Sequence, residues 1–114
     1  MINQQEIKKS EEFSIVKKHV TPQGFLMLAV CDENLLGKRF EEGKLQLDLT
    51  VNYYNGDRVD ETELLQLLKK TYQGNFVGES CIAIAIKHHF LSKESIKHIA
   101  GIAYANMCQI DEIK

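Results

Sequence analysis

The sequence is poor in cysteine and proline, and it lacks long apolar runs. Its three cysteines, Cys31, Cys81 and Cys108, are widely spaced and form no C-x-x-C motif, which disfavours a disulfide scaffold and indicates buried thiols. No apolar stretch approaches the roughly 20 residues that cross a bilayer, and residues 1–13 show no apolar signal core. We therefore expect a soluble, cytoplasmic protein that does not associate with membranes.

A strong charge of one sign is also missing, because 14 basic and 16 acidic residues give a net charge of −2. This balance argues against strong non-specific binding to nucleic acids, which needs lysine and arginine to displace counterions. The charge is uneven, however, since residues 69–98 contain five lysines and only two glutamates. That excess predicts a mildly basic surface, although a solvated face accounts for such a run as well.

Motifs of known catalytic chemistry are lacking. The sequence contains no phosphate-binding loop, G-x-S-x-G elbow or H-E-x-x-H pattern, and the Gly-Glu-Ser at residues 78–80 lacks the glycine that follows a nucleophilic serine. His88 and His89 are adjacent, so on a helix they point about 100° apart rather than forming an i, i+4 metal pair. We predict no bound metal, no cofactor and no assigned catalytic residue.

The length of 114 residues suits one domain, with a flexible tail over residues 1–11 and a single α+β domain over residues 12–114. Residues 13–20 and 25–31 predict two strands joined by a turn at Pro22, and the second strand should be internal because it is apolar on both faces.

Between these strands and the first helix, the pattern predicts three further features. Asp32 should cap a short helical turn over residues 33–36. Residues 45–51 alternate between apolar and polar and predict a half-buried strand. The Asn55-Gly56 pair is typical of a two-residue hairpin turn.

Two helices are predicted in the second half of the chain. Asp60 and Glu63 form a capping-box pattern at the start of the first, over residues 60–70. Residues 71–78 are expected to be a loop. The alternating isoleucines and alanines of residues 76–90 fit both a strand and a helix, but length and alanine content favour a helix. We expect Asn75 to cap that second helix, with Ile82 and Ile86 in the core.

Residues 96–100 and 103–110 predict two short strands that turn at Gly101. The whole pattern therefore predicts a small α+β domain, in which a mixed or antiparallel sheet built from hairpins packs against two main helices.

Four segments resemble an archaeal family known only as domain of unknown function 424: residues 30–49, 53–68, 74–91 and 99–106. The most specific matches are Cys-Asp-x-x-Leu-Leu-Gly-Lys/Arg-x-Phe-x-Glu-Gly, at Cys31, Asp32, Leu35, Leu36, Gly37, Lys38, Phe40, Glu42 and Gly43, and Asn-x-Val-Gly-Glu, at Asn75, Val77, Gly78 and Glu79. The resemblance implies a single α+β domain in an archaeal cytoplasm, and it brings no established reaction. Where the family reads Gly-x-Pro-His-Ala-Gln, Tyr104 replaces the histidine, which weakens an enzymatic interpretation.

Three functional hypotheses remain open. The leading one is a non-catalytic binding module for RNA or a translation-related complex, contacted by Lys69, Lys70, Tyr72, Lys87, Lys93 and Lys97. The alternative is a small-molecule enzyme or ligand-binding protein that uses the loops at residues 31–43 and 74–79, with an anion or ligand held by Asp32, Gly37, Lys38, Asn75, Gly78 and Glu79. The third is a homodimeric protein-interaction subunit joined through an exposed strand edge.

Overall fold

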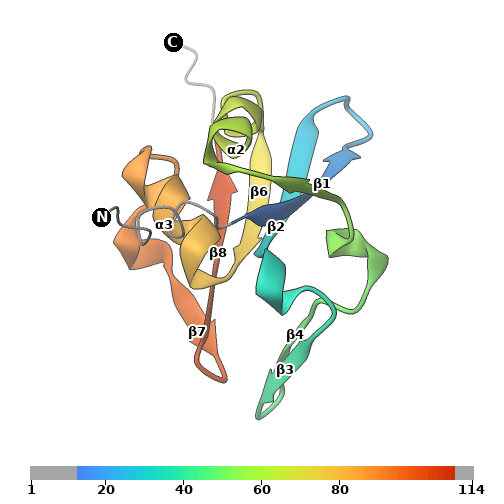
Figure 1. Cartoon of the computed structure of the whole chain (residues 1–114), viewed down its shortest axis with the longest axis vertical. Helices are drawn as coiled ribbons and strands as arrows, with labels where there is room; N and C mark the ends of the chain where they lie inside the picture. Colours follow the sequence, from blue (N-terminus) through green and yellow to red (C-terminus); the bar gives the residue numbers. More distant parts are fainter. Residues whose placement is uncertain (1–12, 110–114) are drawn as a thin grey trace, which may run out of the picture.

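The computed structural model of the protein describes residues 13–109, so the tail expected over residues 1–11 lies outside the described part. Within it, a six-stranded sheet has the order β5-β1-β2-β6-β8-β7, and β3 and β4 form a separate hairpin (Figure 1). The strands are β1 Ser14–Val20, β2 Leu26–Asp32, β3 Arg39–Glu42, β4 Leu45–Asp48, β5 Asp57–Val59, β6 Gln73–Val77, β7 Lys97–Ile99 and β8 Ile102–Cys108. The helices are α2 Glu61–Leu68 and α3 Glu79–Lys87, with 3-10 turns η1 Glu33–Leu35, η2 Asn52–Tyr54 and η3 Lys93–Ser95. The predicted α+β architecture is confirmed.

The predicted β1–β2 hairpin is confirmed, and β2 is the internal strand that its sequence indicated. The turn closes at Gly24, whose φ of +92° suits a residue without a side chain. Residues 28–32 of β2 are all buried, because neighbouring strands cover both edges and both faces are packed. Strand β2 pairs antiparallel with β1 and parallel with β6.

The loop predicted for residues 71–78 is wrong, because residues 73–77 form β6 between β2 and β8. Glycine and asparagine are rare in strands, and this stretch contains Gly74 and Asn75. Here the ring of Phe76 fills the space beside Gly74, since a Cβ atom at that position would lie 3.0 Å from it. Pairing with two distant strands therefore overrides the local preference.

Helix α2 begins with the predicted capping box. The Asp60 carboxylate accepts a hydrogen bond from the Glu63 backbone N–H at 2.9 Å, and the Glu63 carboxylate accepts one from the Asp60 N–H at 3.0 Å. These bonds satisfy amides that have no partner within the helix. Leu64 and Leu68 are fully buried against the sheet, which anchors the apolar stripe of the helix.

Helix α3 is shorter than predicted, because residues 76 and 77 complete β6 and the helix starts only at Glu79. The cap assigned to Asn75 is wrong, since Gly78 holds that position. The helix ends at the two histidines. His89 has a φ of +68°, and the Phe90 N–H donates to the Ala85 carbonyl at 2.8 Å, which closes the last turn. The histidine pair thus terminates a helix.

Two buried clusters lie on opposite faces of the sheet. On one face, α2 and α3 cover side chains such as Val16, Val30 and Phe76 (Figure 1). On the other face, Leu49 and partly buried residues of the β3–β4 hairpin pack over Ile15 and its neighbours. The hairpin covers only the part of this second face close to the end of β2.

Three local predictions need correction. Asp32 makes no side-chain hydrogen bond to the turn that follows it. Gly56 lies outside a hairpin, because it joins η2 to β5. Glycine is required there for another reason, since a Cβ atom would overlap the Val16 carbonyl oxygen of β1. Strand β4 ends at Asp48 rather than at residue 51, and both Leu45 and Val51 are exposed.

The turn between the last two strands is confirmed at Gly101, which has a φ of +81°. The end of the strand predicted over residues 103–110 includes a residue outside the described part.

Candidate functional site

The parallel pairing of β2 and β6 brings the two family motifs together. Both strands end at the same edge of the sheet, where α3 begins, and in open α/β sheets this edge is where ligands bind. A cavity of about 490 Å³ lies there, lined by Phe13 and by residues 32–35, 78–80 and 101–103. Of the predicted anion or ligand residues, the structure gathers Asp32, Gly78 and Glu79 around this cavity, which we call the Asp32 pocket.

Asp32 connects the end of β2 to the start of α3. Its carboxylate accepts hydrogen bonds from the backbone N–H groups of Ser80, at 3.0 Å, and Cys81, at 2.7 Å. It therefore caps a helix 48 residues away rather than the adjacent turn. A carboxylate already occupies the positive end of the helix dipole, and Glu33 and Glu79 add negative charge, so the Asp32 pocket suits a neutral or cationic ligand better than an anion.

The two thiols beside the pocket, Cys31 and Cys81, have low reactivity. Cys81 is fully buried, and its Sγ lies 3.4 Å from the Val77 carbonyl oxygen. Burial, followed by the nearby Asp32 charge, raises the pKa of Cys81 well above its ordinary value and raises the pKa of Cys31 to about 12. Both thiols are therefore protonated near neutral pH and are poor nucleophiles.

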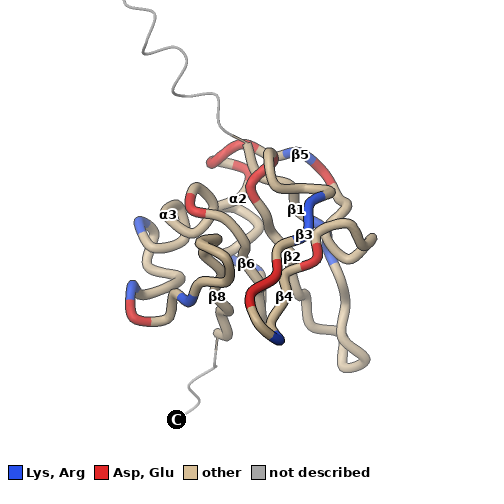
Figure 2. The backbone as a smooth tube through the Cα atoms, turned by 90° about the horizontal axis from the view of Figure 1, so that it is seen from below, with Lys and Arg blue, Asp and Glu red and all other residues tan. Residues whose placement is uncertain are grey.

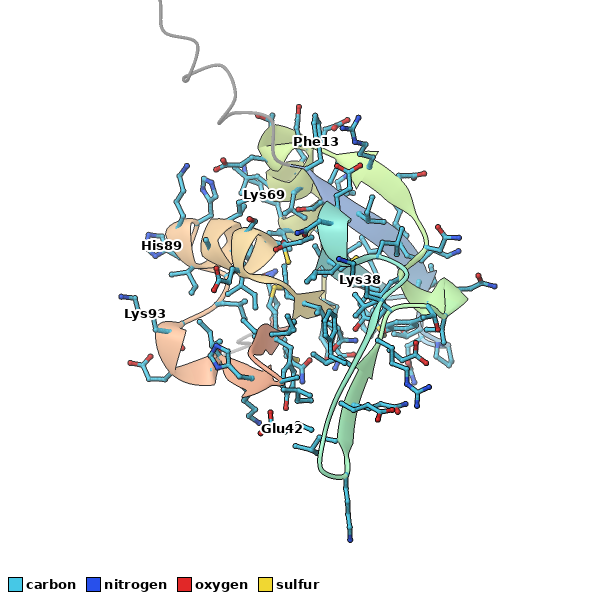
Figure 3. All side chains as sticks on the ribbon, turned by 60° about the horizontal axis from the view of Figure 1, so that its bottom comes forward. Phe13, Lys38, Glu42, Lys69, His89 and Lys93 are labelled. Atoms are coloured by element: carbon cyan, nitrogen blue, oxygen red, sulfur yellow. The ribbon has the colours of Figure 1, made fainter. Side chains whose placement is uncertain are left out.

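The other predicted loop residues lie away from the pocket lining. Gly37 adopts a φ of +87° and donates its N–H to the Leu49 carbonyl at 2.8 Å, and Lys38 is exposed beside it. Asn75 lies in β6, where its Nδ2 donates to the Tyr53 hydroxyl at 2.7 Å. The motif residue Glu42 accepts a hydrogen bond from the Ala100 N–H, which ties the β3–β4 hairpin to the β7–β8 turn (Figure 3). Much of the family pattern thus stabilises the fold.

The six predicted partner-binding residues separate into two groups. Lys69, Lys70 and Tyr72 lie together between the end of α2 and the start of β6. Lys97 pairs with Tyr104, and Tyr104 pairs with Val77, the last residue of β6. Lys97 therefore lies level with the far end of β6, about 16 Å along the strand direction from Tyr72. Lys93 lies in η3, well apart from Lys69 (Figure 3).

Lys87 differs from these lysines because its charge is paired. Its Nζ lies 2.9 Å from the Glu61 carboxylate, and the same oxygen lies 2.9 Å from Nε2 of His88. These contacts join the last turn of α3 to the first turn of α2. They favour a structural role for Lys87, whereas none of the ion pairs within residues 13–109 includes Lys69 or Lys70.

Two segments of the described part of the chain meet at the end of the molecule around Lys69. They are residues 17–27 and 69–74, which contain four lysines and one histidine and no aspartate or glutamate. The two segments join where the Tyr72 N–H donates to the Leu26 carbonyl at 2.9 Å. We call this region the basic end. Lys18 also borders a groove shared with Asp57 and Glu63, which offsets part of its charge.

In a view from the opposite end of the molecule, acidic segments lie on the β3–β4 hairpin and around β5 and α2 (Figure 2). Lys and Arg segments lie beside these acidic segments in the same view, so acidic and basic residues are mixed there.

The basic end also presents a stacked aromatic pair. The rings of Phe25 and Tyr72 have centroids 4.7 Å apart and an interplanar angle of 25°. Phe25 is 48% exposed and the neighbouring Val20 is 70% exposed. These exposed apolar groups beside lysines make the basic end a candidate interaction surface. Sequence reasoning found Tyr72 but missed Phe25, because the latter was interpreted as part of an internal strand.

A second aromatic arrangement, around Tyr53, was also missed. The imidazole of His19 stacks on the Tyr53 ring with centroids 4.4 Å apart, and its Nε2 lies 3.0 Å from the Tyr53 carbonyl oxygen. Because the Tyr53 hydroxyl accepts a hydrogen bond from Asn75 of β6 and the Tyr53 ring stacks on His19 of β1, Tyr53 bridges these two strands across β2. Only the register of three strands brings these residues together, and no local pattern in the sequence signals it.

The structure defines a small α+β domain with two candidate binding surfaces and no recognisable catalytic constellation among residues 13–109. The chain belongs to the family described as "Protein of unknown function (DUF424)", whose model matches residues 19–110. The family resemblance found in the sequence is therefore confirmed. No curated protein matches the sequence.

A solved structure supports the fold. The chain is similar to an uncharacterised conserved protein from Methanopyrus kandleri, an archaeon, with a TM-score of 0.69 and 16% sequence identity. The match covers 90% of this chain and 98% of that one. At this identity the likeness concerns the fold alone.

Two kinds of feature, membrane-spanning helices and metal-ligand clusters, are absent from residues 13–109. No helix in this part of the chain is long and apolar enough to cross a membrane. Within the same residues, no group of three or more His, Cys, Asp or Glu side chains is arranged to hold a metal ion.

Proposed function

We propose that the protein is a non-catalytic binding module that holds single-stranded RNA at the basic end, as a component close to translation. The observation that supports this most is the exposed Phe25–Tyr72 stack within a region that has four lysines and no acidic residue. Single-stranded nucleic acids are bound by this combination of ring faces for bases and cations for phosphates.

The Phe25–Tyr72 stack offers an aromatic ring face on which an RNA base can pack. The two rings are already parallel to within 25°, so no ordering of side chains is required before a base packs on Phe25. Stacking of one base on an aromatic side chain contributes about 1–3 kcal/mol and tolerates every base. Lys69 and Lys70 follow α2 directly and are exposed, which leaves both ammonium groups available for phosphates.

Direct binding of a labelled, unstructured RNA at low salt tests this proposal. Fluorescence anisotropy should show saturable binding by the wild type, and Phe25→Ala or Tyr72→Ala should weaken it at least fivefold. Phe25→Leu is the matched control, because it keeps apolar volume and removes the ring. It should bind as poorly as Phe25→Ala if stacking is responsible. Absence of binding by the wild type at micromolar protein would contradict the proposal.

The convergence of both family motifs on one cavity favours a second candidate function, the binding of a small ligand in the Asp32 pocket. The acidic lining suits a neutral or cationic molecule, and the commitment of the Asp32 carboxylate to two amides argues against its use as a catalytic base. A thermal-shift screen of metabolites tests this function. Stabilisation by a compound that Ser80→Trp abolishes would support the pocket over the basic end.

The homodimer hypothesis receives less support from the geometry. The two edge strands of the six-stranded sheet, β5 and β7, have three residues each, which limits pairing between copies. A cytoplasmic location remains part of the proposal, because it places the module with its RNA.

A further inference from the structure

Part of the sheet face opposite the helices is not covered by any of residues 13–109. Residues that alternate with the helix-facing side chains of β1, β2, β6 and β8 point to this face. Near the end of β2 it is covered by the hairpin cluster around Leu49. Toward the basic end, η2 with Tyr53 contacts β1 and β2 on this side. We call the remainder the open face.

The open face is polar, and the strand residues within 13–109 that form it include no acidic side chain. The strand register places Lys17 opposite Ala29, Ala29 opposite Asn75, and Asn75 opposite Asn106. The next row runs from His19 through Met27 and Gln73 to Cys108. Asn106 and Cys108 are exposed, and Lys17, His19, Met27 and Gln73 are partly exposed. A four-stranded surface therefore presents amides and a lysine to solvent.

Two amides on this face have free hydrogen-bonding capacity. Among the side-chain hydrogen bonds within residues 13–109, Asn75 is engaged by Tyr53, whereas none involves Gln73 or Asn106. Each free amide offers a carbonyl acceptor and two N–H donors. Since both side chains arise from central strands, their backbones are fixed, and they can discriminate between base edges better than side chains on a loop.

The open face is continuous with the aromatic stack of the basic end. Gln73 directly follows Tyr72, and it pairs with Met27, two residues from Phe25. Gln73 and Asn106 lie on neighbouring strands and two residues apart in register, which corresponds to roughly 8 Å. A strand of RNA whose first base packs on Phe25 can therefore continue over Gln73 toward Asn106 without crossing an acidic side chain of these strands.

We infer that the open face reads the sequence of the bound RNA, with Gln73 and Asn106 hydrogen-bonding the edges of bases that follow the stacked base and Lys17 contacting a phosphate. This inference rests on the proposed function and deepens it, because stacking and lysines alone bind every sequence alike. Amide side chains match the paired donors and acceptors on base edges. The module then binds RNAs that contain a particular short sequence more tightly than other RNAs.

Selection from a randomised pool of short RNAs tests the inference. Wild-type protein should enrich a short motif, and Gln73→Ala with Asn106→Ala should lose that enrichment and bind the enriched RNA about tenfold more weakly. The control pair Gln46→Ala with Gln66→Ala removes two exposed amides elsewhere and should keep the motif. Circular dichroism and melting curves of both double variants establish that each is folded.

The possible outcomes separate this inference from the proposed function. If the wild type binds RNA but enriches no motif, or if the Gln73 and Asn106 variant enriches the same motif, the open face does not read sequence and the RNA-binding function stands. If the wild type binds no RNA, both fail. A motif lost equally in the control pair would also overturn the assignment to Gln73 and Asn106.

Discussion

Gly78 and Asp32 are in such close contact that a side chain at residue 78 would overlap the Asp32 carboxyl group. The carboxylate reaches the first amides of α3 only because this position is glycine. Gly78 also has a φ of +118°, which side chains rarely tolerate. The contact explains why the two family motifs, Cys-Asp at residues 31–32 and Val-Gly-Glu at residues 77–79, belong together although they are far apart in the sequence.

Gly78→Ala should therefore destabilise the fold by about 2–4 kcal/mol, from backbone strain and from displacement of the Asp32 cap. Gly24→Ala is the control, because Gly24 also has a positive φ but has no atom within 4 Å of a Cβ. Urea unfolding of both variants separates strain from the clash. Equal losses at the two positions would show that the contact with Asp32 contributes nothing.

The isoleucines of α3 should differ in their contribution to stability. Ile82 is 2% exposed, whereas Ile86 is only partly buried. Ile82→Ala should cost about 2–4 kcal/mol, and Ile86→Ala about half as much, because less apolar surface returns to water. Chemical denaturation gives both values. A cost at Ile86 equal to that at Ile82 would argue against the helix orientation described above.

The three thiols should react very differently. Cys108 is exposed, whereas Cys31 and Cys81 are buried and burial raises the pKa of each, that of Cys31 to about 12. A thiol reagent such as Ellman's should modify one cysteine per chain rapidly near neutral pH, and all three after unfolding. The Cys108→Ser variant should lose the rapid phase. A rapid phase that persists would show that one of the buried thiols is accessible.

Acid should weaken the link between α2 and α3. Hydrogen bonds from Lys87 and then His88 lower the pKa of Glu61 in the folded protein. The stabilisation is present above the unfolded pKa of about 4.3 and is lost as the pH falls through the lower folded pKa. Because the pair is exposed, its contribution should not exceed about 1 kcal/mol.

Glu61→Gln should accordingly reduce stability at pH 7 and have little effect near pH 2, as measured by melting temperature across that range. Glu94→Gln, at an exposed glutamate outside the described ion pairs, should show no such pH dependence. Similar profiles for the two variants would exclude a role for the Glu61 contacts.

The sequence was sufficient for elements governed by local rules. Asp60 and Glu63 marked the start of α2, and Gly101 marked the last turn, because capping and turn geometry involve residues close in the chain. The sequence was insufficient where pairing with distant segments determines the local secondary structure. Gly74 and Asn75 are poor strand residues, yet β2 and β8 hold them in the centre of the sheet.

The candidate sites follow the same division. Lys69, Lys70 and Tyr72 lie close together in the sequence, so they could be predicted as one basic, aromatic surface. Phe25 joins them only through the pairing of β2 with β6, and Gln73 and Asn106 come onto the same face of neighbouring strands only through the pairing of β6 with β8. These contacts join residues 33 to 47 positions apart, so no pattern within a short window could reveal them.

The salt dependence of RNA binding tests the central claim most directly. Each phosphate contact contributes roughly 0.7 to the slope of log affinity against log salt for a single strand. Lys69→Glu with Lys70→Glu should weaken binding and flatten the slope by about 1.4, whereas the charge-matched reversal of Lys93 and Lys97, beyond the other end of β6, should leave the slope unchanged. Equal effects of the two reversals, or a wild-type protein that binds no RNA at low salt, would contradict the assignment of the basic end as the RNA-binding surface.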